Sequence, residues 1–225
     1  MKEIDKQKTS KIIEKDQFFT RGRITNLCDG VLAIVMTILV LDLKIDRIGN
    51  ISSTSLMQEI LKVLPRIETY IIVFILLGFF WLENHRIFEY IKKTDRTFIW
   101  LNIFFLMFIS ILPFFTDLVA EFEKFPIVVA LFGVNLFFVQ LSLFITWRYV
   151  THNHRLIDKS VPQELITYRN INFLVALVIF FFSIPLAFVY HNLPFMLYLT
   201  VPIIICLLNW VKKKKLMSDQ TVKTD

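Results

Sequence analysis

The sequence predicts an all-α membrane protein with six transmembrane helices and with the N- and C-termini in the cytoplasm. Three observations carry this prediction. Hydrophobic residues make up 56% of the 225 positions, which is more apolar material than a soluble core of this size needs. Long apolar windows recur along the chain, and most Lys and Arg residues fall between alternate windows. Because lipid offers no water to satisfy backbone polar groups, each window is expected to be a helix.

The first apolar run is unusually short. It is free of charge only from Gly30 to Leu41, between Asp29 and Asp42, and these 12 residues cover only about 18 Å of helix. We expect this to be too short to cross the hydrocarbon layer with lipid on all sides. The two Asp side chains either mark the interfaces of a short helix or face the bundle interior or a water-filled cavity. The residues alone leave both interpretations open.

One face of this first run carries an aliphatic stripe. On a helical wheel Ile34, Ile38 and Leu41 fall within an arc of about 60°, and Thr37 lies on its flank. Such a stripe is more often a packing surface than the lining of a pore. The pattern by itself therefore favours packing.

Five further windows are long enough for a bilayer, which needs about 20 apolar helical residues. They cover roughly residues 67–91, 97–117, 125–147, 170–190 and 192–211. The chain shows no internal repeat and no linker-like composition, so a single transmembrane domain is expected. We place a cytoplasmic tail at 1–22, the six-helix domain at 23–211 and a basic cytoplasmic tail at 212–225. The charged N-terminal segment does not resemble a removable signal peptide.

The distribution of Lys and Arg predicts the orientation. Twenty of the 25 Lys and Arg residues fall in the N-terminal tail, the 84–96 loop, the 148–169 segment and the C-terminal tail. The positive-inside rule places these segments, and hence both termini, in the cytoplasm. An even number of spans follows, and six fits. A multi-pass protein of the cell membrane is expected, with the lipid bilayer as its surroundings.

Several polar residues are expected at one depth near the cytoplasmic ends of the first three spans. These are Asp29, His85 and Asn102, and Trp81 shares a helix face with His85 at i and i+4. Arg23 precedes Asp29 by six residues and reaches it only if the side chain or the helix bends. Such a cluster could be catalytic, could relay protons or could tie the helices together. A buried Asp needs a cation and hydrogen-bond donors, which favours the tie.

Other chemistries find little support in the sequence. No nucleophile with a facing base is evident, so neither an enzyme nor a cofactor is expected. His152 and His154 are better explained as a solvated loop than as metal ligands. Cys28 and Cys206 are expected to be buried free thiols. Topology accounts for the net charge of +6, so no nucleic-acid partner is expected.

Three segments together resemble a known family of potassium channels, the transmembrane protein 175 family. They are "RITNLCDGVLAIVMTILVLDL", "WLENHRIF" and "RTFIWLNIFFLMFISILPF", and they cover residues 21–115 in the order that the family shows. Positions matching the first-helix signature are Arg23, Asp29, Gly30, Ala33 and Thr37. Leu27 and Cys28 replace the Phe and Ser of the family, so a hydroxyl hydrogen bond there would be weakened to a thiol contact.

The resemblance implies a potassium-permeable cation channel, with other monovalent cations possible. Members of this kind carry one six-span unit per chain and form homotetramers around four first helices. It further implies that Ile34, Ile38 and Leu41 constrict the pore and that Thr37 forms a hydroxyl layer. Asp42 would then form an acidic ring at the outer mouth, unless it merely faces water at the interface.

The competing function is a secondary transporter or a proton-linked membrane carrier that uses Asp29 and His85. A transporter is expected to show repeats or paired broken spans at mid-membrane, which are not evident here.

Overall fold

The computed structural model describes residues 21–43, 53–122, 124–190 and 193–221. Over these residues the protein is a bundle of long helices, and an isolated bridge between Ile91 and Ile157 is its one piece of β-pairing. Six of the described helices are long and apolar enough to cross a membrane. The predicted all-α fold with six spans is therefore confirmed, and the chain is a multi-pass membrane protein. The spans are Arg21–Leu41, Val63–Tyr90, Arg96–Phe122, Pro126–His154, Gln163–Leu186 and Pro194–Lys212.

The first helix corrects one expectation. It covers residues 21–38 and continues into the 3-10 helix η1 (Leu39–Asp42), so the span has 21 residues and reaches about 31 Å. The expected shortness was wrong, because the helix also includes the polar residues before Gly30. The Arg21 guanidinium donates to the Phe88 carbonyl oxygen at 2.9 Å, which fixes the start of this helix against the end of the second span.

The third span is broken in the middle. α3 (Arg96–Ser110) ends one residue before α4 (Leu112–Phe122) begins. Pro113 lacks an N–H and its ring clashes with the preceding turn, which accounts for the break. The Asn135 amide donates to the Phe108 carbonyl oxygen at 3.2 Å. A side chain of the neighbouring α5 thus satisfies a backbone carbonyl group near the kink. Asp95 is the N-cap of α3, and its side chain accepts a hydrogen bond from Phe98 N at 2.9 Å.

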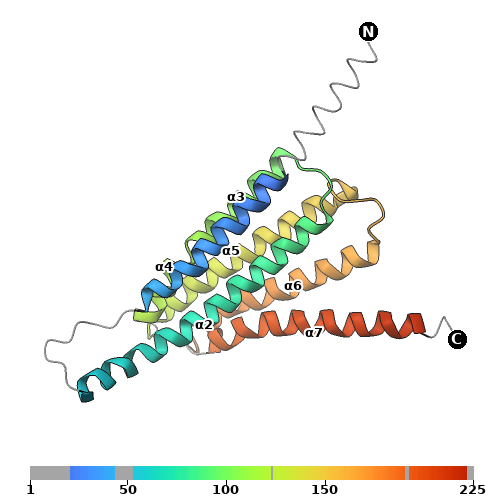
Figure 1. Cartoon of the computed structure of the whole chain (residues 1–225). Helices are drawn as coiled ribbons and strands as arrows, with labels where there is room; N and C mark the ends of the chain where they lie inside the picture. The colour runs from blue at the N-terminus through green and yellow to red at the C-terminus, as the bar shows by residue number, and fades with distance from the viewer. Residues whose placement is uncertain (1–20, 44–52, 123, 191–192, 222–225) are drawn as a thin grey trace, which may run out of the picture.

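α5 (Pro126–Thr151) is the central helix of the bundle (Figure 1). It packs against α2 (Ser53–Tyr90), α3, α4 and α6 (Gln163–Leu186), and it is buried over most of its length. α7 (Leu193–Thr221) packs on α6 and α2 and leans away from the remaining helices toward its C-terminal end. The N-terminal part of α2 projects past the bundle in the same view.

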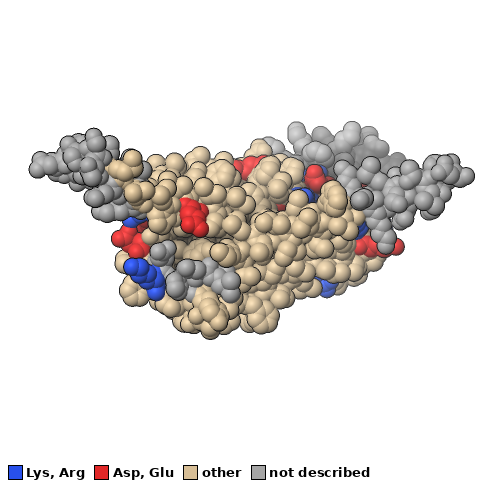
Figure 2. Space-filling model, turned by 90° about the horizontal axis from the view of Figure 1, so that it is seen from below, with Lys and Arg blue, Asp and Glu red and all other residues tan. Residues whose placement is uncertain are grey.

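The two ends of the bundle differ in charge. One end, which we call the basic end, contains the start of the first helix, the ends of α2, α5 and α7, and the starts of α3 and α6. Its described Lys and Arg residues are Arg21, Arg23, Arg86, Lys92, Lys93, Arg96, Arg148, Arg155, Lys159, Arg169 and the four lysines at 212–215. Among the described residues the opposite end has Lys62, Arg66 and Lys124. Between the ends Figure 2 shows a broad surface that is mostly uncharged.

Two loops meet at the basic end. Lys92 N donates to the Leu156 carbonyl oxygen at 2.8 Å, and the Tyr149 hydroxyl donates to Asp95 Oδ2 at 2.6 Å. The Arg155 guanidinium lies 4.5 Å from the Tyr149 ring centroid. The connections after α2 and α5 are thus joined to each other by hydrogen bonds and a cation–π contact.

Candidate functional site

The first helix has two distinct faces. Its buried face repeats every three or four residues and consists of Ile24, Cys28, Leu32, Val35 and Leu39. The predicted aliphatic stripe lies on another face, with exposed fractions of 59% for Ile34, 40% for Ile38 and 61% for Leu41. On the helical wheel the centres of the two faces are about 110° apart. The stripe is therefore not packed inside the chain, contrary to what the pattern alone favours.

Thr37 lies on the exposed side, next to the stripe. Its hydroxyl donates to the Ile34 carbonyl oxygen at 2.8 Å. Because that bond uses the hydroxyl proton, the lone pairs of the oxygen stay available to a cation or to water. Gly30 and Ala33 are also exposed on this side, so the helix presents small, hydroxyl and aliphatic side chains together.

A polar cluster joins the first helix to α2. Trp81 Nε1 donates to Asp29 Oδ1 at 2.8 Å, and the Trp81 and His85 rings stack with centroids 5.4 Å apart. His85 Nε2 lies 3.7 Å from a Glu89 carboxylate oxygen. Asp29, His85 and Glu89 are exposed on the single chain, so Asp29 is not buried within one copy of the bundle. The i,i+4 spacing of His85 and Glu89 was the signal that could have predicted the last member.

Asn102 belongs to a different contact. It is buried, it accepts a weak hydrogen bond from the Cys28 thiol at 3.8 Å, and its amide donates to the Phe98 carbonyl oxygen at 2.8 Å. The thiol contact expected from the replacement of Ser by Cys28 is present. Arg23 is exposed on the first helix. The structure therefore brings Asp29, Trp81 and His85 together but places Asn102 in a separate, buried pair.

The remaining predicted site residues have simpler placements. Asp42 ends η1, and its side chain lies outside the described residues. Cys28 is buried but Cys206 is exposed, and both are free thiols, so the expected burial of Cys206 is wrong. His154 Nε2 lies 3.2 Å from the Val161 carbonyl oxygen. The described part of the chain contains no group of three or more potential metal ligands.

One buried charge cluster was missed by the sequence analysis. The Glu83 side chain is only 3% exposed and accepts hydrogen bonds from Arg86 Nη1 at 2.6 Å and Arg169 Nη1 at 3.2 Å. The i,i+3 spacing of Glu83 and Arg86 was visible in the sequence. Arg169 comes from α6 and becomes a partner only through the fold.

Comparisons with known proteins point to channels of one family. Residues 23–113 match the model of a family described as the endosomal/lysosomal potassium channel TMEM175. A potassium channel of Chryseobacterium sp. is 34% identical over 52% of this chain and 58% of its own length. A potassium channel of Streptomyces collinus is 26% identical over 75% of this chain and 82% of its own length. The chain thus spans little more than half the length of the first of these relatives and most of the second.

Two other similarities extend the comparison. The endosomal/lysosomal proton channel TMEM175 of Gallus gallus is 30% identical over 53% of this chain and 26% of its own length. The crystal structure of a lysosomal potassium-selective channel TMEM175 homolog from Chamaesiphon minutus matches with a TM-score of 0.74. That match covers 84% of this chain and 97% of the other at 21% identity, and it supports the fold.

Proposed function

Because residues 23–113 match the model of the TMEM175 family, we propose that the chain is a potassium-permeable cation channel whose pore is lined by the first helix. The observation that carries the proposal is the exposed stripe of Ile34, Ile38 and Leu41. This stripe lies in the matched segment, on a face that the chain itself leaves uncovered. Relatives named as potassium channels support the same conclusion.

A pore of this kind requires several copies of the chain. A single bundle presents one stripe and does not surround a path for an ion. Closed cyclic symmetry places the same stripe of every copy around one axis, and we propose four copies, with the basic end in the cytoplasm. The small residues Gly30 and Ala33 on the exposed side allow neighbouring first helices to approach closely.

The side chains of the stripe suggest how the pore works. Rings of Ile and Leu form a hydrophobic constriction that empties of water when it is narrow and thereby blocks ions. The Thr37 hydroxyl oxygen offers lone pairs between the Ile34 and Ile38 levels, where a partly dehydrated cation needs a polar contact. Asp42 at the end of η1 would add negative charge at the outer mouth. These residues would select among cations and gate the pore without any covalent chemistry.

Asp29, Trp81 and His85 then hold the pore helix in place. The hydrogen bond from Trp81 to Asp29 fixes the first helix to α2 near the basic end. Asn102 does the same for α3 through Cys28. The named relatives are channels, so a carrier that uses Asp29 and His85 is not favoured.

Reconstitution tests this proposal. The purified full chain in a planar bilayer, with potassium on one side and sodium on the other, is expected to give unitary current steps and a reversal potential shifted toward potassium. Saturable flux without unitary steps would contradict the proposal. Wild-type currents from a variant with Asn at Ile38 would contradict the assignment of the constriction.

A further inference from the structure

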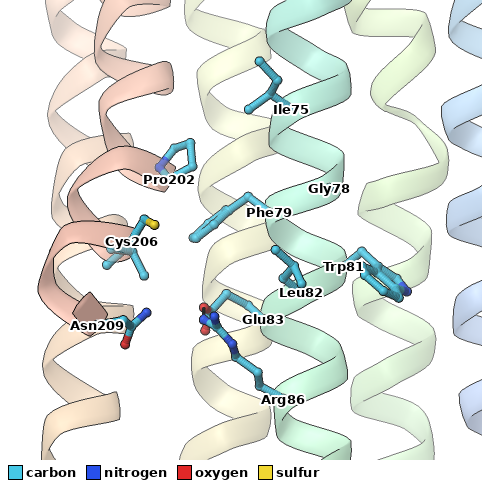
Figure 3. A pocket seen from close by; sticks show the side chains of 11 residues that line it. Ile75, Gly78, Phe79, Trp81, Leu82, Glu83, Arg86, Pro202, Cys206 and Asn209 are labelled. Atoms are coloured by element: carbon cyan, nitrogen blue, oxygen red, sulfur yellow. Dashed lines mark hydrogen bonds and ion pairs between the residues drawn. The ribbon is translucent and has the colours of Figure 1, made fainter. Parts of the chain in front are cut away.

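A groove separates α2 and α7 on the side of α2 that faces away from the first helix (Figure 3). Its volume is roughly 490 Å³, and its lining residues come from these two helices. Because the groove opens at the outer surface of the bundle, it lies apart from the proposed pore stripe. In a bilayer, an open groove of this size between two membrane-spanning helices is occupied either by a lipid or by a helix of another chain.

The groove is apolar toward the middle of the bundle and polar toward the basic end. Ile75 and Phe79 on α2 face Pro202 and Ile205 on α7 in the apolar part. Arg86 and Asn209 lie together with Glu83 in the polar part, and Figure 3 shows these polar side chains converging from the two helices. The lining therefore changes along the groove from hydrocarbon to hydrogen-bonding groups.

The polar part carries an unbalanced positive charge. The Glu83 carboxylate neutralises one guanidinium, yet both Arg86 and Arg169 contact it. The Arg169 side chain is only 10% exposed, and the Arg86 side chain, at 32%, is open to the groove. Glu164 and Lys212 also interact here and offset each other. An excess charge in a poorly solvated place needs a counter-ion, and the side chains that the structure describes supply none in this cluster.

Asn209 adds a hydrogen-bond donor beside this charge. Its Oδ1 accepts from the Tyr168 hydroxyl at 3.2 Å and from the Asn172 amide at 3.4 Å. These two bonds orient the carboxamide, and its nitrogen points into the groove in Figure 3. A guanidinium and an amide N–H thus face the same space, and both donate to an anionic oxygen.

The level of these groups in the bundle matches that of a lipid headgroup. Arg86 lies in the last two turns of α2, Arg169 in the second turn of α6, and Asn209 one turn before Lys212, where the last span ends. Long cationic side chains at this level reach the boundary between the acyl chains and the headgroups. The apolar part of the groove then lies at the depth of the acyl chains.

We propose that this groove binds an anionic phospholipid. The headgroup phosphate would accept hydrogen bonds from Arg86 and Asn209 and balance the second guanidinium, and one acyl chain would lie along Ile75, Phe79 and Ile205. A helix of a second copy would fill the apolar part but would not neutralise the charge, whereas an anionic lipid does both. Binding of this lipid depends on the groove and its charges and does not require conduction.

The experiment compares lipids on the purified full chain in neutral detergent. Dioleoylphosphatidylglycerol is expected to bind saturably, as counted by native mass spectrometry, and to raise the melting temperature. Dioleoylphosphatidylcholine and inorganic phosphate are expected to do neither. Arg86→Gln should weaken binding of the anionic lipid by about ten- to a hundredfold, the range for a lost hydrogen bond to a charged group. Glu83 keeps Arg169 as a partner in this variant.

Two further variants keep the test decisive. Arg148→Gln removes an equal charge from an exposed position at the same end of the bundle and should leave lipid binding unchanged. Gly78→Leu should fold, because a Cβ added there meets no atom within 4 Å and the rest of the side chain can extend into the groove, and it should abolish binding by filling the groove. Equal effects of both lipids or of inorganic phosphate, or normal binding by Arg86→Gln, would overturn the proposal. The proposal would also be overturned if Gly78→Leu lost the oligomer while lipid binding stayed unchanged, because a second copy would then occupy the groove.

Discussion

The two faces of the first helix predict opposite consequences for Leu32→Ala and Ile34→Ala. Leu32 is 1% exposed and Ile34 is 59% exposed. Lipid tails are as apolar as a leucine, so truncating Leu32 removes packing more than it removes hydrophobic transfer energy. We therefore expect a loss near the lower end of the range for a buried Leu→Ala change, about 2 kcal/mol. Ile34→Ala should cost less than about 0.5 kcal/mol, as is usual for exposed positions.

Conduction should show the reverse order. Ile34→Ala shortens a side chain of the proposed constriction and should raise the open probability or the unitary conductance, while Leu32→Ala should leave the unitary conductance unchanged. Reversible unfolding in mixed micelles measures the first effect, and single-channel recording measures the second. Similar stability losses for the two variants, or a larger conductance change in Leu32→Ala, would refute the assignment of the two faces.

Three further predictions concern individual side chains. Trp81→Phe removes the hydrogen bond to Asp29 and should cost about 1 kcal/mol of unfolding free energy; a double-mutant cycle with Asp29→Asn that shows no coupling would contradict the contact. Glu83→Gln leaves two guanidinium groups without a carboxylate and should cost about 3–5 kcal/mol, and a wild-type melting temperature would argue against the buried cluster. Asp42→Asn should reduce inward potassium current at low salt but not at about 1 M, where the Debye length is about 3 Å; equal currents throughout would leave the acidic ring unsupported.

Hydropathy was enough to predict the fold class and the number of spans. It failed at the start of the first helix because an apolar window ends where polar residues begin. Arg21 and Asp29 nevertheless belong to the helix, since the Phe88 carbonyl oxygen and Trp81 satisfy them. Partners of this kind come from another helix, and a hydropathy profile does not contain them.

For the candidate site, the level of each residue along the bundle was predictable, but the side of the helix on which each side chain lies was not. Topology correctly placed Asp29, His85 and Asn102 near one end of the bundle. It did not reveal that Asn102 faces Cys28 inside the bundle while His85 faces Glu89 outside. The rotation of each helix depends on side-chain packing over its whole length. The pairing of Glu83 with Arg169 is unpredictable for the same reason, because it requires the docking of α6 on α2.

Accessibility of the first helix to water tests the central claim most directly. Single cysteines at Ile34, Ile38, Leu41 and the buried Leu39, in a background without the two native cysteines, are exposed to a charged thiol reagent during potassium current recording. The channel proposal predicts that the first three positions react and block the current and that the Leu39 position does not. Protection of all four positions would mean that the stripe faces lipid or protein and would contradict a pore lined by the first helix.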